Sequence, residues 1–304
     1  MPELPEVETV ARGLDGRLKG QSIDSIDIRY AKSFDVSKAL IEKHVIGAKV
    51  KRVWRRQKLL IFELSTDWAL VAHLKMTGQF VFVFKGGRGQ ETGKQSYTGG
   101  HPQKAYEQDL PHKHTHVVFK LSSGTLYFND LRKFGWIKLL PSQQGAVSGG
   151  RQTLDQFLAA QEFSPEPLSK DFSVSWLKEK FKRRSLPIKQ VIMDQKVAGG
   201  VGNIYADEAL FNARLSPKKI AKTLTDSDVT KLYYSIRKVL RMGIKHGGTT
   251  SNNYRNADGE AGQMQNYLKV YGREGLPCKD DCRGVVERIQ LGGRSTHFCL
   301  SCQK

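Results

Sequence analysis

The first six residues, Met1-Pro2-Glu3-Leu4-Pro5-Glu6, place a proline second in the chain with carboxylates directly behind it. Removal of Met1 would make Pro2 the free N-terminus, and a terminal amine has a pKa of about 7.7 to 8.0, against about 10.4 for a lysine. Because much of that amine is unprotonated near neutral pH, it can attack an aldehyde carbon and form an iminium. Pro2 is therefore the lead candidate nucleophile, although prolines also commonly stiffen the start of a helix.

All four cysteines fall within the last 27 residues, as Cys278-Lys-Asp-Asp-Cys282 and Cys299-Leu-Ser-Cys302. Four thiolates in two close pairs can complete a tetrahedron around zinc, and in a reducing compartment disulfides are the weaker alternative. Between the pairs, residues 285–291 followed by Gly292-Gly293 predict a β-hairpin with a glycine turn. The pattern predicts one structural Zn²⁺ that staples a hairpin too small to fold without it.

Two other motifs leave their roles open. The segment Ala198-Gly-Gly-Val-Gly-Asn203-Ile-Tyr-Ala206 lets the backbone turn tightly. A helix beginning near Asn203 would offer free amide groups to a phosphate, and a plain glycine hinge between packed helices fits equally well. His112, His114 and His116 alternate along one side of a strand. Because this motif itself contains no acidic or cysteine ligand, we expect a strand start there and no second metal.

Charge narrows the class of partner. The 304-residue chain has a formal net charge of +19 and a pI near 9.8, so its surface should attract a polyanion, and nucleic acid is the usual one. Ribosomal and some membrane-surface proteins share this balance. No apolar run approaches the ~20 residues that span a bilayer, and the N-terminus lacks the basic start and apolar core of a signal peptide. We expect a cytosolic or nucleoid-associated protein with no membrane partner.

The elements that must position these residues change in kind along the chain. Val7, Val10, Leu14 and Leu18 recur at helical spacing, so a helix with Pro5 in its first turn should run to Gly20. Segments typical of strands in a sandwich or barrel then follow at 25–30, 59–64, 69–74, 80–84, 116–121, 125–128 and 135–140. Helical periods appear around 154–158, 176–181 and 188–192, and across 226–245.

Four motifs occur in order along nearly the whole chain: Pro2-Glu-Leu-Pro-Glu-Val-Glu8, Arg55-Arg-Gln-Lys58, Gly200-Val-Gly-Asn-Ile-Tyr-Ala206 and Gly293-Arg-Ser-Thr-His-Phe-Cys299. Together they resemble the bacterial formamidopyrimidine-DNA glycosylases, which remove 8-oxoguanine and also cleave abasic (AP) sites. Each motif alone is a weak signal, but four in register make coincidence improbable.

The resemblance implies an α+β multidomain fold and a monomer that binds damaged double-stranded DNA. We expect an N-terminal helix and catalytic β-sandwich domain at 1–140 and a linker at 141–150. A helical, helix-two-turn-helix DNA-binding domain with a lesion-capping loop should occupy 151–265, and a zinc-finger β-hairpin 266–304. The capping loop would lie in the polar segment 247–265.

The resemblance also implies an activity, the excision of oxidised purines followed by strand cleavage. In this family the N-terminal proline, here Pro2, attacks the anomeric carbon, expels the base and holds the sugar as a Schiff base, from which β,δ-elimination breaks the strand. Glu3 would move protons, Glu6 would support the site, and Lys58 would stand beside the lesion and its phosphate. Without the family pattern, Glu6 is equally well an ordinary first-turn carboxylate, and Lys58 an ordinary lysine at a strand edge.

Turning a nucleotide out of the helix leaves a space that must be filled. By resemblance, Met76 and Phe134 are apolar wedges and Arg132 contacts the widowed cytosine. His73, Asn203 and Arg294 match phosphate clamps of the family, and Arg294 is counted with the catalytic residues. Taken alone, Met76 and Phe134 could be core residues, but both follow polar turns at strand ends, where loop tips meet partners.

Two features depart from the family pattern. The first cysteine pair has three intervening residues where the family usually has two, a spacing that zinc ligands still allow. The segment 85–108 is longer than the family's connection and rich in glycine, so we interpret it as a flexible insertion.

Two alternatives remain. An endonuclease VIII-like enzyme, which prefers oxidised pyrimidines, usually begins Pro-Glu-Gly, whereas this chain has Leu4 and the Arg132-Lys-Phe134 motif. A noncatalytic zinc protein that keeps the fold would have no need of Pro2, Glu3 and Lys58.

Overall fold

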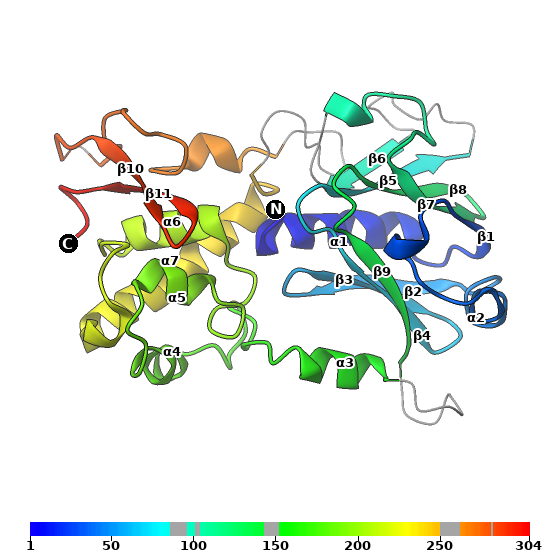
Figure 1. The fold of residues 1–304 in the computed structure, drawn as a ribbon, viewed down its shortest axis with the longest axis horizontal. Coiled ribbons are helices and arrows are strands. Elements are labelled where there is room, and N and C mark those ends of the chain that lie inside the picture. The colour runs from blue at the N-terminus through cyan, green and yellow to red at the C-terminus, as the bar shows by residue number, and fades with distance from the viewer. Residues whose placement is uncertain (86–95, 101–103, 143–151, 250–261, 281) are drawn as a thin grey trace. The chain divides into compact units, whose positions relative to one another are not determined.

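The computed structural model describes residues 1–85, 96–100, 104–142, 152–249, 262–280 and 282–304 (Figure 1). Most of the predicted linker, the centre of the predicted capping loop and much of the predicted insertion therefore lie outside the described residues. The chain forms two compact units. Unit 1 comprises Met1–Pro2, Glu6–Gln161 and Gly247–Gln263, and unit 2 comprises Glu3–Pro5, Glu162–His246 and Met264–Lys304.

The N-terminal part of the chain is built from one helix and two antiparallel sheets. Helix α1 (Leu4–Leu18) has Pro5 in its first turn, as the spacing predicts. The five-stranded sheet runs in the order β1 (Ile23–Ile28), β7 (Thr115–Leu121), β8 (Gly124–Asp130), β5 (Gly78–Phe84) and β6 (Ser96–Gly100). The four-stranded sheet runs β2 (Val50–Arg56), β3 (Leu59–Leu64), β4 (Trp68–His73) and β9 (Trp136–Pro141). Unit 1 also contains two short α-helices, α2 (Lys38–His44) and α3 (Leu154–Ala160), and two 3-10 helices at Ala31–Ser33 and Lys104–Tyr106.

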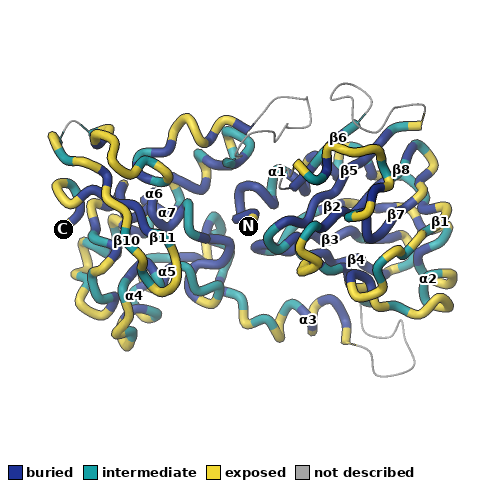
Figure 2. Tube along the Cα trace, turned by 45° about the horizontal axis from the view of Figure 1, so that its top comes forward, coloured by how far each residue is buried: buried dark blue, intermediate teal, exposed yellow. Residues whose placement is uncertain are grey.

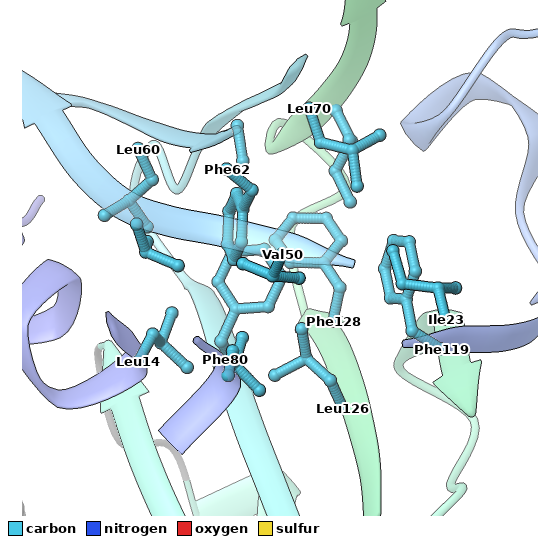
Figure 3. Packing of buried hydrophobic residues seen from close by; sticks show 14 of the residues in the cluster. Leu14, Ile23, Val50, Leu60, Phe62, Leu70, Phe80, Phe119, Leu126 and Phe128 are labelled. Carbon is cyan, nitrogen blue, oxygen red and sulfur yellow. The ribbon is translucent and has the colours of Figure 1, made fainter. Parts of the chain in front are cut away.

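The two sheets and α1 share one apolar core. Alternate residues of facing strands point inward, which is the period-two pattern of a sandwich. Phe62 of β3 packs against Phe80 of β5, and Phe80 packs against Phe128 of β8. Leu60 of β3 and Leu14 of α1 belong to the same cluster (Figure 3). Burial of this cluster stabilises unit 1 by about 25 cal/mol for each Å² of apolar surface removed from water.

The predicted strands are all present, and no end is shifted by more than two residues. Two strands were not predicted from the sequence. Strand β2 carries four basic residues among seven, and only Val50 and Val53 are buried, so its apolar alternation is weak. Strand β6, Ser-Tyr-Thr-Gly-Gly, has too few branched or aromatic residues to be distinguished from a loop.

Unit 2 contains helices and a hairpin. Its helices are α4 (Val174–Phe181), α5 (Ile188–Met193), α6 (Asn203–Asn212) and α7 (Asp226–Lys245), and β10 (Val286–Leu291) pairs with β11 (Arg294–Cys299). Every residue of α6 from Tyr205 to Phe211 is buried, so this helix is the centre of the unit (Figure 2). Helix α7 begins at a capping box, in which the Thr225 side chain accepts from the Asp228 N–H and Asp228 accepts from the Thr225 N–H.

Among the described residues, no helix is both long and apolar enough to cross a membrane.

Candidate active site and nucleic-acid interface

The N-terminal segment is buried even though the first residue is not. Met1 is 44% exposed, whereas Pro2 is buried. Glu6, the expected supporting residue, is also buried, and its Oε1 accepts hydrogen bonds from the Thr249 N–H (2.7 Å) and the Thr249 hydroxyl (3.0 Å). A side chain on Gly248 would collide with Glu6, because a Cβ there would lie 2.9 Å from Glu6 Oε1. Glu6 therefore holds the first residues of the predicted lesion-capping segment.

An ion pair fixes α1 against strand β2. The Arg55 Nε atom lies 2.7 Å from Glu8 Oε2, and the Arg55 side chain is only 10% exposed. Strand β2 ends at the next residue and turns back into β3 through Gln57 and Lys58, with Gln57 in the left-handed region at φ 50°. Lys58, expected beside the lesion, is 6% exposed. The structure thus gives a buried, positioned lysine, which differs from the solvated strand-edge lysine that would be the ordinary alternative.

One end of the four-stranded sheet gathers several candidate residues. The register pairs Arg56 with Leu59, Leu59 with His73, and His73 with Trp136, which is a single row across all four strands. The β2–β3 turn with Lys58, the end of β4 and the start of β9 therefore lie at the same end of unit 1. Sequence spacing alone does not predict this, since 78 residues separate Lys58 from Trp136.

His73 is a neutral, oriented imidazole. Burial, together with the nearby charges of Lys75 and Lys58, lowers the pKa of His73 from 6.5 to about 3. Its Nδ1 accepts a hydrogen bond of 2.9 Å from the Lys75 N–H, so the ring hydrogen resides on Nε2. An imidazole held in this tautomer can donate from Nε2 to an anionic oxygen without carrying charge itself.

The three predicted space-filling residues lie on two loops that connect the sheets at this end. Met76 lies between β4 and β5, and Arg132 and Phe134 lie between β8 and β9. Phe134 is 53% exposed, with the Arg132 guanidinium carbon 4.8 Å from the centre of its ring. Phe134 is therefore not a core residue, and Met76 is only partly buried. Their role in opening DNA remains a prediction.

Glu3 groups with unit 2, where its carboxylate caps helix α6. It accepts hydrogen bonds from the N–H groups of Gly202 (2.7 Å), Ile204 (2.9 Å) and Tyr205 (3.3 Å). These are amides that α6 cannot satisfy internally, and the positive end of the helix dipole adds to their attraction for a carboxylate. Gly202 is required there, because a Cβ would lie 2.4 Å from Glu3 Cδ.

The sequence leaves a phosphate site and a plain glycine hinge equally open at this helix N-terminus. The amides of Gly202, Ile204 and Tyr205 are not free for a phosphate, because they donate to Glu3. A carboxylate from the chain itself takes the place of the external anion. Asn203 remains a candidate phosphate contact through its side chain. Its Oδ1 is buried with no hydrogen-bond partner among the described residues, and its side chain hydrogen-bonds Tyr271. Burial raises the pKa of Tyr271, and this hydrogen bond opposes the rise.

A buried ionic network joins two helices of unit 2 to the hairpin. Lys189 of α5 places its Nζ 2.7 Å from Asp207 Oδ1, and it donates to the Ser295 carbonyl and the Thr296 hydroxyl, each at 2.8 Å. Asp207 Oδ2 accepts from the His297 N–H at 2.9 Å. Burial lowers the pKa of Lys189, and Asp207 opposes this effect. Because a buried charge without its partner is strongly unfavourable, the network fixes β11 against α5 and α6.

Arg294 is the first residue of the strand that this network holds. The preceding turn, Gly292-Gly293, has both residues at positive φ, 55° and 72°, as a two-residue hairpin turn requires. Arg294 is exposed. A rigid hairpin and a solvent-facing guanidinium are what a phosphate clamp requires.

The four cysteines converge on one point. Their Sγ atoms all lie within 4.8 Å of one another, with Cys278 and Cys302 at 3.6 Å and Cys282 and Cys299 at 3.5 Å. A tetrahedral zinc with Zn–S bonds of about 2.3 Å needs sulfurs roughly 3.8 Å apart, and a disulfide needs about 2.0 Å. The donor set therefore fits Zn²⁺ and does not fit disulfides. The Cys-x3-Cys spacing reaches this arrangement, although residue 281 within it lies outside the described residues.

Several supporting residues were not predicted from the sequence. Thr77 and Asp130 connect the β4–β5 loop to the β8–β9 loop, and Lys189 and Asp207 connect the helices to the hairpin. The available signal was a charged or polar residue inside an otherwise apolar helix or strand, since such residues are rarely buried unless they are paired. The sequence does not show which residue is the partner.

Three family models match successive parts of the chain. Residues 1–137 match the formamidopyrimidine-DNA glycosylase N-terminal domain, residues 163–255 match the formamidopyrimidine-DNA glycosylase H2TH domain, and residues 275–304 match the zinc finger found in FPG and IleRS. These three matches follow in the order that the sequence motifs predict.

Curated relatives match over the full length. A formamidopyrimidine-DNA glycosylase of Desulfitobacterium hafniense is 40% identical over 304 residues, covering 100% of both proteins. One from Pelotomaculum thermopropionicum is 38% identical over 308 residues, covering 100% of this chain and 99% of the relative.

Solved structures of the same family have a similar fold. The Lactococcus lactis Fpg in complex with DNA containing an abasic site has a TM-score of 0.82 at 33% identity, with 99% of both chains covered. A mutant of the same protein with DNA containing Fapy-dG has a TM-score of 0.83 at 33% identity, with 100% of both chains covered. The cysteine cluster is thus the structural zinc site of a zinc finger, and the chain belongs to the formamidopyrimidine-DNA glycosylase family.

Proposed function

We infer that this protein is a bifunctional base-excision-repair enzyme that removes oxidised purines from duplex DNA and cleaves the strand at the resulting abasic site. The observation that carries this function is the buried N-terminal Pro2-Glu3 pair in a chain that matches the family over its full length. Substrates would be 8-oxoguanine and formamidopyrimidines. The +19 charge supplies the attraction for DNA.

Base removal begins at Pro2 after Met1 has been cleaved. The lone pair of the Pro2 nitrogen attacks C1′ of the damaged nucleotide, and the glycosidic bond breaks with its electron pair leaving on the base, which takes up a proton. The proline nitrogen then loses its proton to a base. Protonation of O4′ lets the C1′–O4′ bond break with its electron pair leaving on O4′, and the nitrogen lone pair forms an iminium with C1′. Met1 must be absent, because a nitrogen in a peptide bond has no lone pair available for attack.

Strand cleavage follows from the same intermediate. The iminium withdraws electrons, so a base can remove a proton from C2′, and the released pair expels the 3′ phosphate. A second elimination expels the 5′ phosphate, and water hydrolyses the remaining Schiff base to free Pro2. We assign the proton transfers to Glu3, which directly follows the nucleophile Pro2 in the sequence. Three amides at the N-terminus of α6 hold its carboxylate in place.

The remaining residues bind and open the DNA. Lys58, His73, Asn203 and Arg294 would contact phosphates at and around the lesion. Met76, Arg132 and Phe134 would fill the space that the everted nucleotide leaves. The segment 247–265, which Glu6 holds at Thr249, would cover the everted base.

Zn²⁺ bound by the four cysteines has no part in the chemistry. Bound there, it cross-links two knuckles of chain and fixes the hairpin that presents Arg294. We propose that the enzyme acts as a monomer in the cytoplasm, associated with the nucleoid.

Borohydride trapping tests this proposal. Reduction of the Schiff base should link wild-type, Met1-free protein covalently to duplex DNA containing 8-oxoguanine opposite cytosine, and Pro2→Gly should greatly weaken the linkage. Pro5→Ala is the matched control, since Pro5 lies in the first turn of the same helix with its nitrogen inside the chain. It should trap as the wild type does.

If full-length wild-type protein without Met1 gives no trapped species, the enzymatic function is ruled out. A panel of duplexes carrying oxidised purines and oxidised pyrimidines would separate this activity from that of an endonuclease VIII-like enzyme.

A further inference from the structure

The hydroxyl of Tyr106 bridges the two loops that carry the predicted space-filling residues. Tyr106 belongs to a short 3-10 helix, Lys104–Tyr106, at the end of the segment interpreted from the sequence as a flexible insertion. Its hydroxyl donates to the Thr77 carbonyl at 2.6 Å and accepts from the Leu131 N–H at 2.7 Å. Thr77 directly follows Met76, and Leu131 directly precedes Arg132.

A second bridge lies beside the first. The Thr77 hydroxyl hydrogen-bonds Asp130 Oδ1, and the Arg132 N–H donates to both, at 3.1 Å to Thr77 Oγ1 and 3.2 Å to Asp130 Oδ1. Asp130 Oδ2 accepts from the Gly135 N–H at 2.6 Å. The two loops are therefore one hydrogen-bonded assembly, and the Tyr106 hydroxyl joins them from outside the loops and their flanking strands.

The ring of Tyr106 is itself held in place. Tyr106 is 8% exposed, and its ring stacks on His112 with centroids 5.5 Å apart and planes 6° from parallel. His114 meets the same ring edge-on at 6.2 Å. Burial raises the pKa of Tyr106 well above its usual value, so the hydroxyl keeps its proton and remains a donor at every physiological pH.

Both loops need such support. Lys75, before Met76, and Lys133, between Arg132 and Phe134, have φ values of 53° and 58°. A side-chain-bearing residue in this left-handed region is strained and persists where surrounding contacts hold it. The loops would otherwise relax and carry their exposed side chains to other positions.

We propose that Tyr106 is a positioning residue that holds the Met76 loop and the Arg132–Phe134 loop at a fixed mutual geometry, so that the three side chains enter the duplex together when a base is turned out. This role rests on the proposed function, in which these side chains fill the vacated space. The end of the segment 85–108, which contains Tyr106, would then take part in opening the DNA.

The test uses Tyr106→Phe, which removes one oxygen and keeps the ring stack. Tyr127→Phe is the matched control, because Tyr127 is also 8% exposed and lies in the same unit, and its hydroxyl makes neither of these bridges. Single-turnover rates are measured on a duplex with 8-oxoguanine opposite cytosine and on the same duplex with an abasic site at that position.

Tyr106→Phe should slow excision of 8-oxoguanine by about tenfold, as expected for one lost hydrogen-bond bridge, and slow cleavage of the abasic site by less than about twofold. The abasic site has no base to unpair and unstack, so its cleavage depends less on the side chains of Met76, Arg132 and Phe134. Equal losses on both substrates, or no loss on either, would overturn the proposal. Inactivity of the wild type on both substrates would instead refute the proposed function.

Amide hydrogen exchange tests the bridge independently of activity. In Tyr106→Phe the Leu131 N–H loses its acceptor, and its exchange should become about tenfold faster, while Tyr127→Phe should leave it unchanged. An unchanged Leu131 rate in Tyr106→Phe would show that the hydroxyl does not hold the loop.

Discussion

At the scale of single residues, neighbouring groups set the chemical state of each candidate side chain. His73 shows this, because an ordinary imidazole would be partly charged near neutral pH, whereas the His73 pKa lies near 3. A neutral ring can donate to phosphate and still accept from the Lys75 N–H. Glu3 shows the same principle, since the backbone amides of Gly202, Ile204 and Tyr205 hold its carboxylate in place.

His73 also predicts a pH dependence of stability. Above pH 6.5 the ring is neutral in both the folded and the unfolded chain. As the pH falls from 6.5 toward 3, the unfolded chain takes up the proton first, so this group lowers the free energy of unfolding across that window. His73→Asn, which keeps an acceptor for the Lys75 N–H, should lose stability less steeply with acid. Thermal unfolding from pH 4 to 8 measures the slopes, and the two proteins should run parallel above pH 7. Equal slopes below pH 6 would contradict the assignment.

At the scale of elements, close approaches explain the glycine-rich motif better than flexibility does. Gly200 has φ 86° and lies against Leu4, and Gly202 lies against Glu3. The glycines therefore let the N-terminus of α6 meet residues 3 and 4 of the chain. This function of the motif combines the two sequence interpretations, a tight turn and an anion-binding helix end, with Glu3 as the anion.

Gly202→Ala tests this contact. An added Cβ would lie 2.4 Å from Glu3 Cδ, so the carboxylate must move, and a displacement of about 1 Å at a reacting group costs about a hundredfold in rate. We expect single-turnover excision to fall by about that factor. Gly16→Ala is the control, because Gly16 is exposed within α1, and a Cβ there would meet no atom within 4 Å beyond its chain neighbours and the backbone of its own helix. It should keep full activity and gain roughly 0.5–1 kcal/mol of stability. Wild-type rates in Gly202→Ala would show that Glu3 need not occupy this position.

At the scale of the whole molecule, the net charge of +19 predicts a steep response of DNA affinity to salt. If about six phosphates are neutralised, the affinity should fall by about a thousandfold or more between 50 and 200 mM salt. Arg294→Gln should reduce the slope of log affinity against log salt by about one. Titrations by fluorescence anisotropy measure both slopes, and a flat response would mean that the basic surface does not engage the duplex.

The separate cores predict how the protein responds to loss of zinc. The hairpin cluster of Phe211, Val270, Val286 and the cysteines is small, whereas the sandwich core is extensive and holds no metal ligand. Metal analysis should give one zinc per chain, and Cys282→Ser should lose DNA binding before the sandwich unfolds. Ser301→Ala, in the second knuckle between Cys299 and Cys302, should keep both. Full DNA binding by zinc-free protein would refute the role of the metal as a staple.

The sequence by itself determined the features that depend on local spacing. Helical periodicity located α1 and α7, alternation located most strands, and paired cysteines with a Gly-Gly turn defined the zinc hairpin. The order of the motifs gave the family and its reaction. These signals are local because each depends on residues within one turn, one strand or one knuckle.

Only the tertiary structure decided which distant residues act together. It showed that Glu3 occupies the α6 amides, that Lys189 and Asp207 hold the hairpin bearing Arg294, and that Tyr106 ties Thr77 to Leu131. A buried polar residue in the sequence shows that a partner must exist, because leaving it unpaired is costly. Strand register and helix packing determine which residue is the partner. Both depend on many weak apolar contacts across the chain, so the sequence around either residue does not identify its partner.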